Sequence, residues 1–316
     1  MATILTIPPE VVMNILGRLD PFSLESVAKT LSSRLYYPAA QLLEPRKGWI
    51  ENARAMCKLF NPRGSRGVLP SYPGYLPVLA DHHLVRDEIP RRDYQGLGLD
   101  QDGGPYVRSS PPDFQSWIAL DGTFSWLQSL EKKIADEMEP HNGREGDRPV
   151  ATKAQIERLV AKAEELGLKL PAGFEAFMAD NHFHHRIPSY SAWYFNLSKL
   201  VRCPSSVDNG SGGYIVRFYW DQQACAFAYL YLSQSGHHCI LMSMLDLYDE
   251  MELDEEEIED GHDGNGDVDE DDVVMVALTF EEYLAMVYYE ELLEFRAKPF
   301  KGLCDYVKHT YIAPAE

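Results

Sequence analysis

The hydrophobic positions of the first 35 residues predict two short amphipathic helices. Pro8 and Pro9 precede the first helix, and the first turn of a helix tolerates proline because its N–H groups have no partner within the helix. Its apolar face repeats at i, i+3, i+4 and i+7 and consists of Val12, Ile15, Leu16 and Leu19.

Asp20 and Pro21 supply a capping residue and a first-turn proline for the second helix. The apolar face of that helix consists of Leu24, Val27, Ala28, Leu31 and Leu35. The two helices cannot bury these faces fully on each other, so we expect them to pack on the rest of the chain or on another protein.

Between residues 36 and 150 the pattern alternates between helical and turn-rich sequence. Residues 36–60 keep a helical spacing of apolar side chains, whereas residues 61–112 are rich in Gly, Pro and Ser, which oppose helices and long strands. Residues 114–138 again predict a helix, with apolar positions Trp117, Ile118, Trp126, Leu127, Leu130 and Ile134. We therefore divide this part into an N-terminal helical module, residues 1–45, and a helical and Pro/Gly-rich connecting region, residues 46–150.

Two helices are predicted at the start of the C-terminal half. Thr152 and Gln155 have the spacing of a capping box, which opens a helix that ends at Gly167. Leu170 and Pro171 then begin a second, shorter helix.

A sheet follows these helices. Three strand-like runs separated by short turns predict an antiparallel meander: residues 214–220, 225–232 and 237–243. A fourth strand is expected at residues 273–278, and a closing helix starts at the capping box of Thr279 and Glu282. This order predicts an α+β domain, residues 151–316, that folds independently. Its most buried positions are expected to include Phe174, Phe218, Tyr229, Leu230 and Leu284.

The net charge of −20 is concentrated in one segment. Residues 246–272 hold 16 acidic residues and no Lys or Arg, and the rest of the chain has 33 acidic against 29 basic residues. Like charges at this density repel one another, so we expect a solvated, disordered insertion, with electrostatic docking of a basic partner as the alternative. An EF-hand loop starting at Asp263 is disfavoured, since Val268 and Val274 stand where that loop needs glycine and glutamate. The sign of the charge also argues against nucleic-acid binding.

The remaining composition favours a cytoplasmic or nuclear protein. The five cysteines are odd in number and widely spaced, with no C-x-x-C pair, which is typical of reduced thiols rather than disulfides. The sequence has no apolar run of about 18 residues, the length that predicts a membrane-spanning helix. We recognise no secretory leader at its N-terminus.

Candidate chemistry is sparse. Two clusters contain residue types that bind zinc: His182, His184 and His185, and His237, His238 and Cys239. Neither cluster has a recognised ligand spacing, and neighbouring residues of a strand face opposite ways, so we expect ordinary loop and sheet-edge side chains. The chain also lacks a nucleophile elbow, a P-loop and an H-E-x-x-H motif. The sequence therefore predicts a non-catalytic protein with no cofactor and no metal.

The N-terminal module resembles the F-box, the helical module that binds the Skp adaptor of SCF-type ubiquitin ligases. The resemblance is carried by Ile7, Pro8, Glu10, Ile15, Leu16, Leu19, Pro21, Leu24 and Val27. It implies that these residues bind the adaptor. Ile7 stands where the family has leucine, Gly17 interrupts the first helix, and no tryptophan occurs near residues 31–35.

The C-terminal domain resembles the SUKH superfamily, the fold of yeast cell-wall-assembly regulators and bacterial immunity proteins. Its Leu-Pro-x-x-Phe-x-x-Phe element corresponds to Leu170, Pro171, Phe174 and Phe177. The Asp-Gln-Gln block of the fungal branch corresponds to Asp221, Gln222 and Gln223, ahead of a Tyr-Leu-Tyr-Leu strand. The resemblance implies a mainly antiparallel sheet flanked by helices, and the acidic insertion is a departure from it.

Together the two resemblances imply a non-catalytic adaptor. The F-box-like helices would recruit a ubiquitin ligase through the Skp adaptor, and the SUKH-like domain would bind a client protein. The alternative is a SUKH-like regulatory or scaffold protein whose N-terminal helices pack on its own domain, with no link to ubiquitin. The sequence predicts neither nucleic acid nor membrane as a partner.

Overall fold

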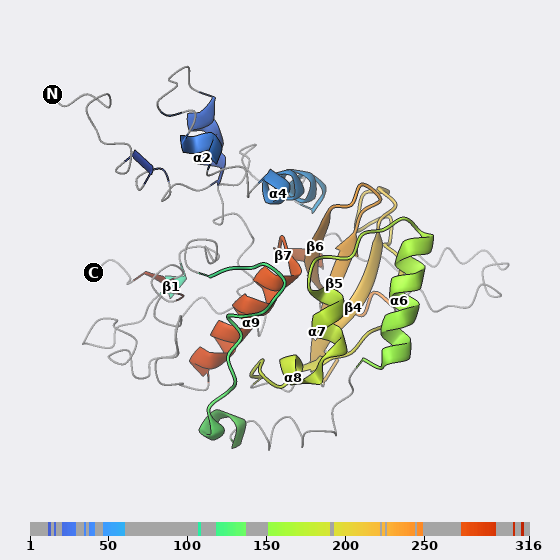
Figure 1. Cartoon of the computed structure of the whole chain (residues 1–316). Helices are drawn as coiled ribbons and strands as arrows, with labels where there is room; N and C mark the ends of the chain where they lie inside the picture. Colours follow the sequence, from blue (N-terminus) through green and yellow to red (C-terminus); the bar gives the residue numbers. More distant parts are fainter. Residues whose placement is uncertain are drawn as a thin grey trace.

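An antiparallel sheet of six strands lies at the centre of the computed structural model (Figure 1). The structure describes residues 12–13, 16, 21–29, 35, 38–41, 47–60, 107–108, 118–136, 151–189, 193–221, 223–224, 226–243, 245–248, 273–294, 306 and 311–312. Helices accompany this sheet, so the fold class is α+β, as the sequence predicts.

The sheet contains the predicted meander. Its strands are β2 (Trp193–Phe195), β3 (Val201–Arg202), β4 (Tyr214–Asp221), β5 (Phe227–Leu232), β6 (His238–Ser243) and β7 (Val273–Ala277). They run in the order β2-β4-β5-β6-β7, with β3 also paired to β4, and every pair is antiparallel. The three predicted meander strands and the fourth strand are therefore confirmed to within one or two residues.

The two faces of the sheet carry two separate hydrophobic clusters. All six residues of β5 are buried, and successive side chains of a strand point to opposite faces. Ala228, Leu230 and Leu232 belong to the first cluster, together with residues of the helices α6, α7 and α9. Phe227, Tyr229 and Tyr231 belong to the second, together with residues of α4. Because both faces are covered, the sequence of β5 is a continuous apolar run rather than an alternating one.

The helices of the first face are α6 (Lys153–Glu165), α7 (Phe174–Ala179), α8 (Asn181–His184) and α9 (Phe280–Glu294). Both predicted capping boxes are present: Thr152 and Gln155 bond reciprocally at the start of α6, and Thr279 and Glu282 do so at the start of α9. The helix predicted from Leu170 starts only at Phe174, because Gly173 precedes it in the left-handed conformation, with φ of 77°.

The five predicted core positions are all fully buried: Phe174, Phe218, Tyr229, Leu230 and Leu284. Phe174 contacts the ring of Phe218 at a centroid distance of 6.0 Å and that of Phe280 at 4.7 Å. These contacts join α7, the sheet and α9 into one core.

The prediction of a helix over residues 114–138 is wrong for most of the residues that the structure describes there. Residues 118–131 form bends and turns, and only residues 132–136 are helical. Gly122 and Phe124 both have positive φ, 80° and 55°, which breaks a helix. The backbone N–H of Gly122 and the indole N–H of Trp126 each donate to the Glu281 carboxylate over 2.7 Å. Most apolar side chains of this segment therefore pack in the core from an irregular backbone rather than from one face of a helix.

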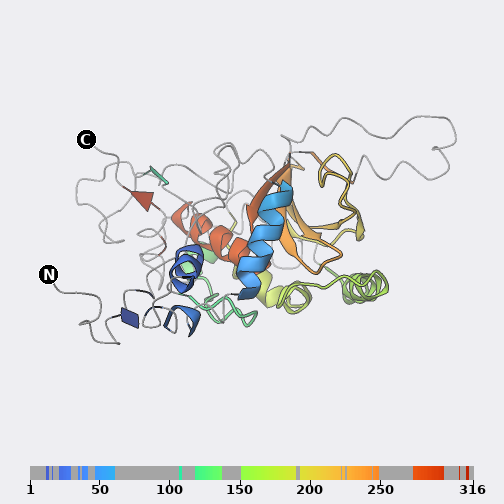
Figure 2. The same cartoon turned by 90° about the horizontal axis from the view of Figure 1, so that it is seen from above.

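The second face is covered by α4 (Lys47–Phe60), which lies against the sheet in the view from above (Figure 2). Its residues Ala53, Met56 and Cys57 are buried in the second cluster. A third, smaller cluster joins Ile50 of α4 to Val12, Leu16 and Ala39. The helix α2 (Pro21–Ala28) contributes to this third cluster through Val27 and Ala28, which are half-buried.

The predicted domain boundary at residue 150 divides residues that share a hydrophobic core. Phe124, Trp126, Leu127 and Ile134 belong to the first cluster, and α4 closes the second. A two-stranded sheet also pairs β1 (Val107–Arg108) with β8 (Tyr311–Ile312), which joins the predicted connecting region to the end of the chain.

The predicted acidic insertion begins with packed residues. Leu247 and Tyr248 are buried in the second cluster, and Asp246 forms an ion pair with Arg217. The first three residues of the predicted insertion, 246–248, are therefore packed rather than disordered. Its remaining residues, 249–272, lie outside the described part of the chain.

Candidate functional site

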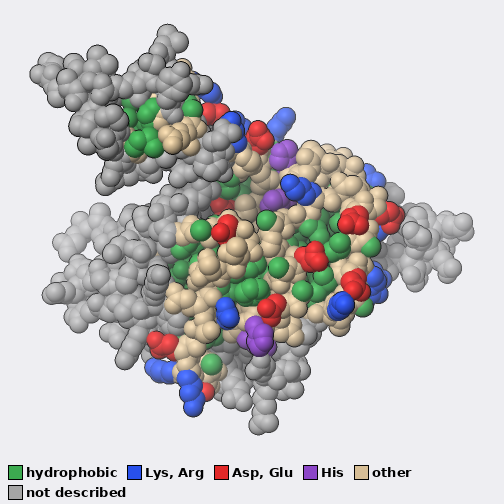
Figure 3. All heavy atoms as spheres, viewed as in Figure 1, with side chains coloured by type: hydrophobic (Ala, Val, Ile, Leu, Met, Phe, Trp, Pro, Cys, Tyr) green, Lys and Arg blue, Asp and Glu red, His purple; other side chains and the backbone are tan. Residues whose placement is uncertain are grey.

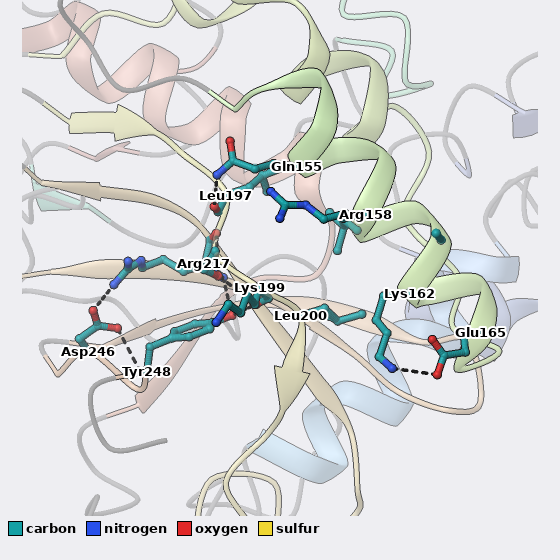
Figure 4. Close-up of a pocket in the computed structure, with 13 residues that line it drawn as sticks. Gln155, Arg158, Lys162, Glu165, Leu197, Lys199, Leu200, Arg217, Asp246 and Tyr248 are labelled. Atoms are coloured by element: carbon teal, nitrogen blue, oxygen red, sulfur yellow. Dashed lines mark hydrogen bonds and ion pairs between the residues drawn. The ribbon is translucent and has the colours of Figure 1, made fainter. Parts of the chain in front are cut away.

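A pocket of about 770 Å³ opens between α6 and the segment that links β2 to β3 (Figure 4). One wall is α6, and the other is formed by the segment between β2 and β3, by Arg217 of β4 and by the turn after β6. The lining residues are Gln155, Arg158, Leu159, Ala161, Lys162, Glu165, Leu197, Ser198, Lys199, Leu200, Arg217, Asp246 and Tyr248.

The α6 wall follows from helical spacing. Gln155, Arg158, Leu159 and Lys162 stand at i, i+3, i+4 and i+7, so they share one face of the helix. Leu159 is buried in the first hydrophobic cluster, and this anchors the face. The side-chain amide of Gln155 donates to the Leu197 carbonyl over 3.1 Å, which fixes the distance between the two walls at one end.

The opposite wall is held by backbone contacts. The Arg217 N–H donates to the Ser198 hydroxyl over 2.9 Å, and the Ser198 N–H donates to the Arg217 carbonyl over 3.1 Å. The Tyr248 hydroxyl donates to the Lys199 carbonyl. Burial raises the pKa of this hydroxyl, so it remains a donor across the physiological range.

Arg217 is the fixed charge of the pocket. Its guanidinium forms an ion pair with Asp246 and lies 5.4 Å from the ring centroids of Trp220, Phe227 and Tyr248. Such cation–π contacts stabilise a partly desolvated cation. The Tyr229 hydroxyl lies 3.1 Å from the carboxylate of Asp246, which also holds the turn after β6 in place.

The other cations of the pocket lie on its exposed rim. Lys162 forms an ion pair with Glu165, with a distance of 2.8 Å between Nζ and Oε1. Among the described residues, neither Arg158 nor Lys199 forms an ion pair. Four cations thus face two carboxylates, and the two surplus charges are positive. Figure 3 shows acidic and basic side chains interspersed over α6.

The lining of the pocket combines charged and apolar side chains. The residues that line the pocket include no histidine and no cysteine, which are the usual bases and thiol nucleophiles. The one lining hydroxyl other than Tyr248, that of Ser198, accepts from the backbone of Arg217 and lies next to no base in the lining set. Charged and apolar side chains remain, and these recognise ligands through ion pairs and burial.

The predicted SUKH-like motif residues lie in the scaffold, and none of them lines the pocket. Pro171, Phe174 and Phe177 are buried, and Leu170 packs partly buried against the first cluster. The Asp221 carboxylate accepts the Ala226 N–H over 3.2 Å and thereby closes the β4–β5 turn. Gln223 is exposed in that turn, and Gln222 lies outside the described residues.

The predicted adaptor-binding residues are described only in part. Leu16 is buried with 4% of its surface exposed, and Val27 is half-buried. Pro21 and Leu24 belong to α2, while their side chains lie outside the described part. The others lie outside it entirely: Ile7, Pro8, Glu10, Ile15 and Leu19.

Of the histidines and cysteines that the sequence singled out, His184 and the described cysteines are buried, and His238 is half-buried. His184 packs against the rings of Phe177 and Phe195 at 5.1 and 4.9 Å. Burial, with smaller contributions from His237 and Lys169, lowers the pKa of His238 to about 4. Cys57, Cys203 and Cys239 are free and buried in the second cluster. Burial raises the pKa of the Cys57 thiol to about 12, so its reactive thiolate form is disfavoured.

The sequence analysis missed all the charged residues of the pocket. One signal was present: Arg217 is the single charged residue within the strand Tyr-Ile-Val-Arg-Phe-Tyr-Trp, where every neighbour is apolar or aromatic. A buried or half-buried charge needs a partner, so its position indicated a site. The partner Asp246 could not be found, because the acidic residues around it masked it.

Among the described residues, no group of three or more His, Cys, Asp or Glu side chains is arranged to hold a metal ion. In the same part of the chain, no helix is both long and apolar enough to cross a membrane. Comparisons with models of protein families, with curated proteins and with solved structures found no match.

Proposed function

We propose that this protein is a non-catalytic adaptor. In this proposal the F-box-like N-terminal helices bind the Skp adaptor of an SCF-type ubiquitin ligase, and the SUKH-like α+β domain binds a client protein. The observation that carries it is the position of α4, which packs on the sheet and on the N-terminal helices at once.

The contact of α4 with the sheet is polar as well as apolar. The Asn52 amide donates to the carbonyls of His238 and Leu278 over 2.8 and 2.9 Å, and its oxygen accepts the His238 N–H over 2.8 Å. Asn52 therefore takes the hydrogen-bonding place of a neighbouring strand beyond the end of β7. The indole of Trp49 donates to the Glu282 carboxylate over 2.9 Å, which ties α4 to α9.

The contact of α4 with the N-terminal helices uses its other side. Ile50 packs with Val12 and Leu16, and Arg54 forms an ion pair with Glu25 of α2. Burial raises the pKa of Glu25, but the hydrogen bond and charge of Arg54, with a smaller contribution from Lys29, outweigh it and hold the pKa below its usual value. One helix thus contacts both the N-terminal helices and the sheet. A fixed connection suits an adaptor, because it keeps a client at a constant distance from the ligase.

The pocket supports binding as the role of the α+β domain. Its lining offers cations and leucines for recognition. The buried free thiols accord with a reducing compartment, so the proposal places the protein in the cytoplasm or nucleus.

Co-purification with the Skp adaptor tests the ligase link. We expect the full chain to retain the adaptor and Leu24→Asp to lose it, because a charge on an apolar docking face is costly unless paired. Ser26→Asp is the matched control, since Ser26 is an exposed position on the same helix. Thermal melting of both variants checks that each remains folded. Equal retention of the adaptor by both variants would contradict the assignment.

A regulatory or scaffold protein without a ubiquitin link is the second candidate. One observation favours it: Val12 and Leu16 are each only 4% exposed, because they pack on Ala39 and Ile50 of the same chain. Under this alternative the N-terminal helices serve to complete the fold. The full chain would then fail to retain the Skp adaptor, while the client-binding role of the pocket would remain.

A further inference from the structure

We infer that the pocket beside α6 binds a short acidic segment of the client protein, with at least one apolar side chain in that segment. This inference rests on the proposed client-binding role of the α+β domain, and it is independent of the ligase link.

Charge is the first reason. The chain has a net charge of −20, yet Arg158, Lys162, Lys199 and Arg217 gather around one pocket. Lys162 and Arg217 are paired with the carboxylates of Glu165 and Asp246. Arg158 and Lys199 are left without an ion pair among the described residues, so the pocket attracts anionic groups.

The pairing and exposure of each cation indicate which cations contact the ligand. Arg217 is held by Asp246 and by three aromatic rings, so it is part of the wall. Arg158 and Lys199 are exposed and stand on opposite walls (Figure 4). Two carboxylates spaced along a segment would therefore meet one cation from each wall.

Size and apolar lining are the second reason. Leu159, Leu197 and Leu200 line the pocket between the charged residues. A cavity of about 770 Å³ falls within the range of sites that enclose whole ligands rather than single small anions. Burial of an apolar side chain on these leucines adds affinity that a free inorganic anion could not gain.

Fluorescence anisotropy of the purified full chain tests the inference without the ligase. The probe is a short labelled peptide of Asp, Glu and Leu, and its control replaces Asp and Glu by Asn and Gln. We expect only the acidic peptide to bind, with an affinity that falls as salt is raised from about 0.05 to about 0.3 M.

The variant Arg158→Glu with Lys199→Glu is expected to weaken the acidic peptide about tenfold or more, because it reverses both unpaired charges. Lys153→Glu is the matched control, since Lys153 is an exposed cation of the same helix outside the pocket, and it should change affinity less than about twofold. Circular dichroism and thermal melting confirm that the variants are folded.

Three results would overturn the inference: no binding of the acidic peptide by the full chain, equal affinity for both peptides, or equal weakening by Lys153→Glu. Binding that occurs only after removal of residues 251–270 would assign the pocket to the chain's own acidic segment and would also overturn it. Failure of the full chain to retain the Skp adaptor, together with intact binding of the acidic peptide, would contradict only the ligase link.

Discussion

The helices α4 and α6 are similar in length and amphipathic character, yet they have different roles. The 14 residues of α4 bury Ile50, Asn52, Ala53, Met56 and Cys57, and its contacts reach the sheet on one side and the N-terminal helices on the other. The 13 residues of α6 bury only Ile156, Leu159 and Ala163. Its cations stay exposed at the pocket.

The difference lies in the polar residues. Asn52 of α4 is buried and makes three hydrogen bonds to backbone groups, so it fixes the helix in one position on the sheet. The charged residues of α6 are exposed, and their ion pairs with each other stabilise the fold little. An amphipathic pattern thus shows that one face of a helix packs on the protein. Whether its polar residues are buried then indicates whether the helix joins two parts of the fold or stays available to bind a ligand.

The first hydrophobic cluster, on which α6 packs, gives the largest expected effect on stability. Phe174 is fully buried between the rings of Phe218 and Phe280. Phe174→Ala should lower the free energy of unfolding by roughly 3–5 kcal/mol, because it removes a buried ring and leaves a cavity. Urea titration measures this, and Glu175→Ala, at an exposed position of the same helix, should stay within about 0.5 kcal/mol. An equal effect of both substitutions would show that α7 does not hold this core together.

Asn52→Ala tests the connecting role of α4. The substitution leaves the His238 N–H and the carbonyls of His238 and Leu278 without their partner. We expect a loss of about 3 kcal/mol in the free energy of unfolding, since each unsatisfied buried group costs about 1–3 kcal/mol. Glu51→Ala, at an exposed position of the same helix, is the control for helix propensity. A loss below about 0.5 kcal/mol would mean that Asn52 does not anchor α4.

Acid should lower the stability of the fold through the side chain of His238. Burial lowers the pKa of this side chain to about 4 from 6.5, so the unfolded chain binds a proton between these values while the folded chain does not. The stability that neutral His238 contributes is therefore complete above pH 6.5 and is lost as the pH falls towards 4. One pKa unit corresponds to about 1.4 kcal/mol, so the loss reaches at most about 3 kcal/mol.

Urea titrations across this pH range measure the effect, and His238→Gln isolates it from other titrating groups. The variant should lose less stability in acid than the unmodified chain does. Identical pH dependence of the two proteins would contradict a buried neutral His238.

The α6 side should show the smallest effect on stability. Arg158→Ala removes an exposed cation that forms no ion pair among the described residues, so the free energy of unfolding should change by less than about 0.5 kcal/mol. Affinity for the acidic peptide should fall at the same time. A large loss of stability would show that Arg158 has a structural role, as Asn52 does in α4.

Local patterns of the sequence were enough to predict strands β4 to β7 and the starts of two helices, whereas the short strands β2 and β3 were not predicted. Capping boxes such as Thr152 with Gln155 involve neighbours in sequence, and the apolar run of β5 needs no information from elsewhere in the chain. Residues 118–131 were misjudged because their apolar spacing fits a helix, whereas the contacts of Gly122 and Trp126 with Glu281 override it.

The pocket could not be predicted in the same way. Arg158, Lys199, Arg217 and Asp246 come from four separate segments, which only the folded chain brings together. The position of α4 was missed for the same reason, since Asn52 and His238 are 186 residues apart. Pairings over such distances depend on the tertiary structure and leave no periodic pattern.

Hydrogen exchange of the intact protein tests the connecting role of α4 most directly. If α4 is part of the sheet's core, the amides around Asn52 and Met56 should open with the same free energy as those of β5 and β6. In Asn52→Ala the protection of α4 should fall further than that of β5. Fast exchange throughout α4 beside a protected sheet, in the unmodified chain, would contradict the proposal that α4 joins the two modules into one body.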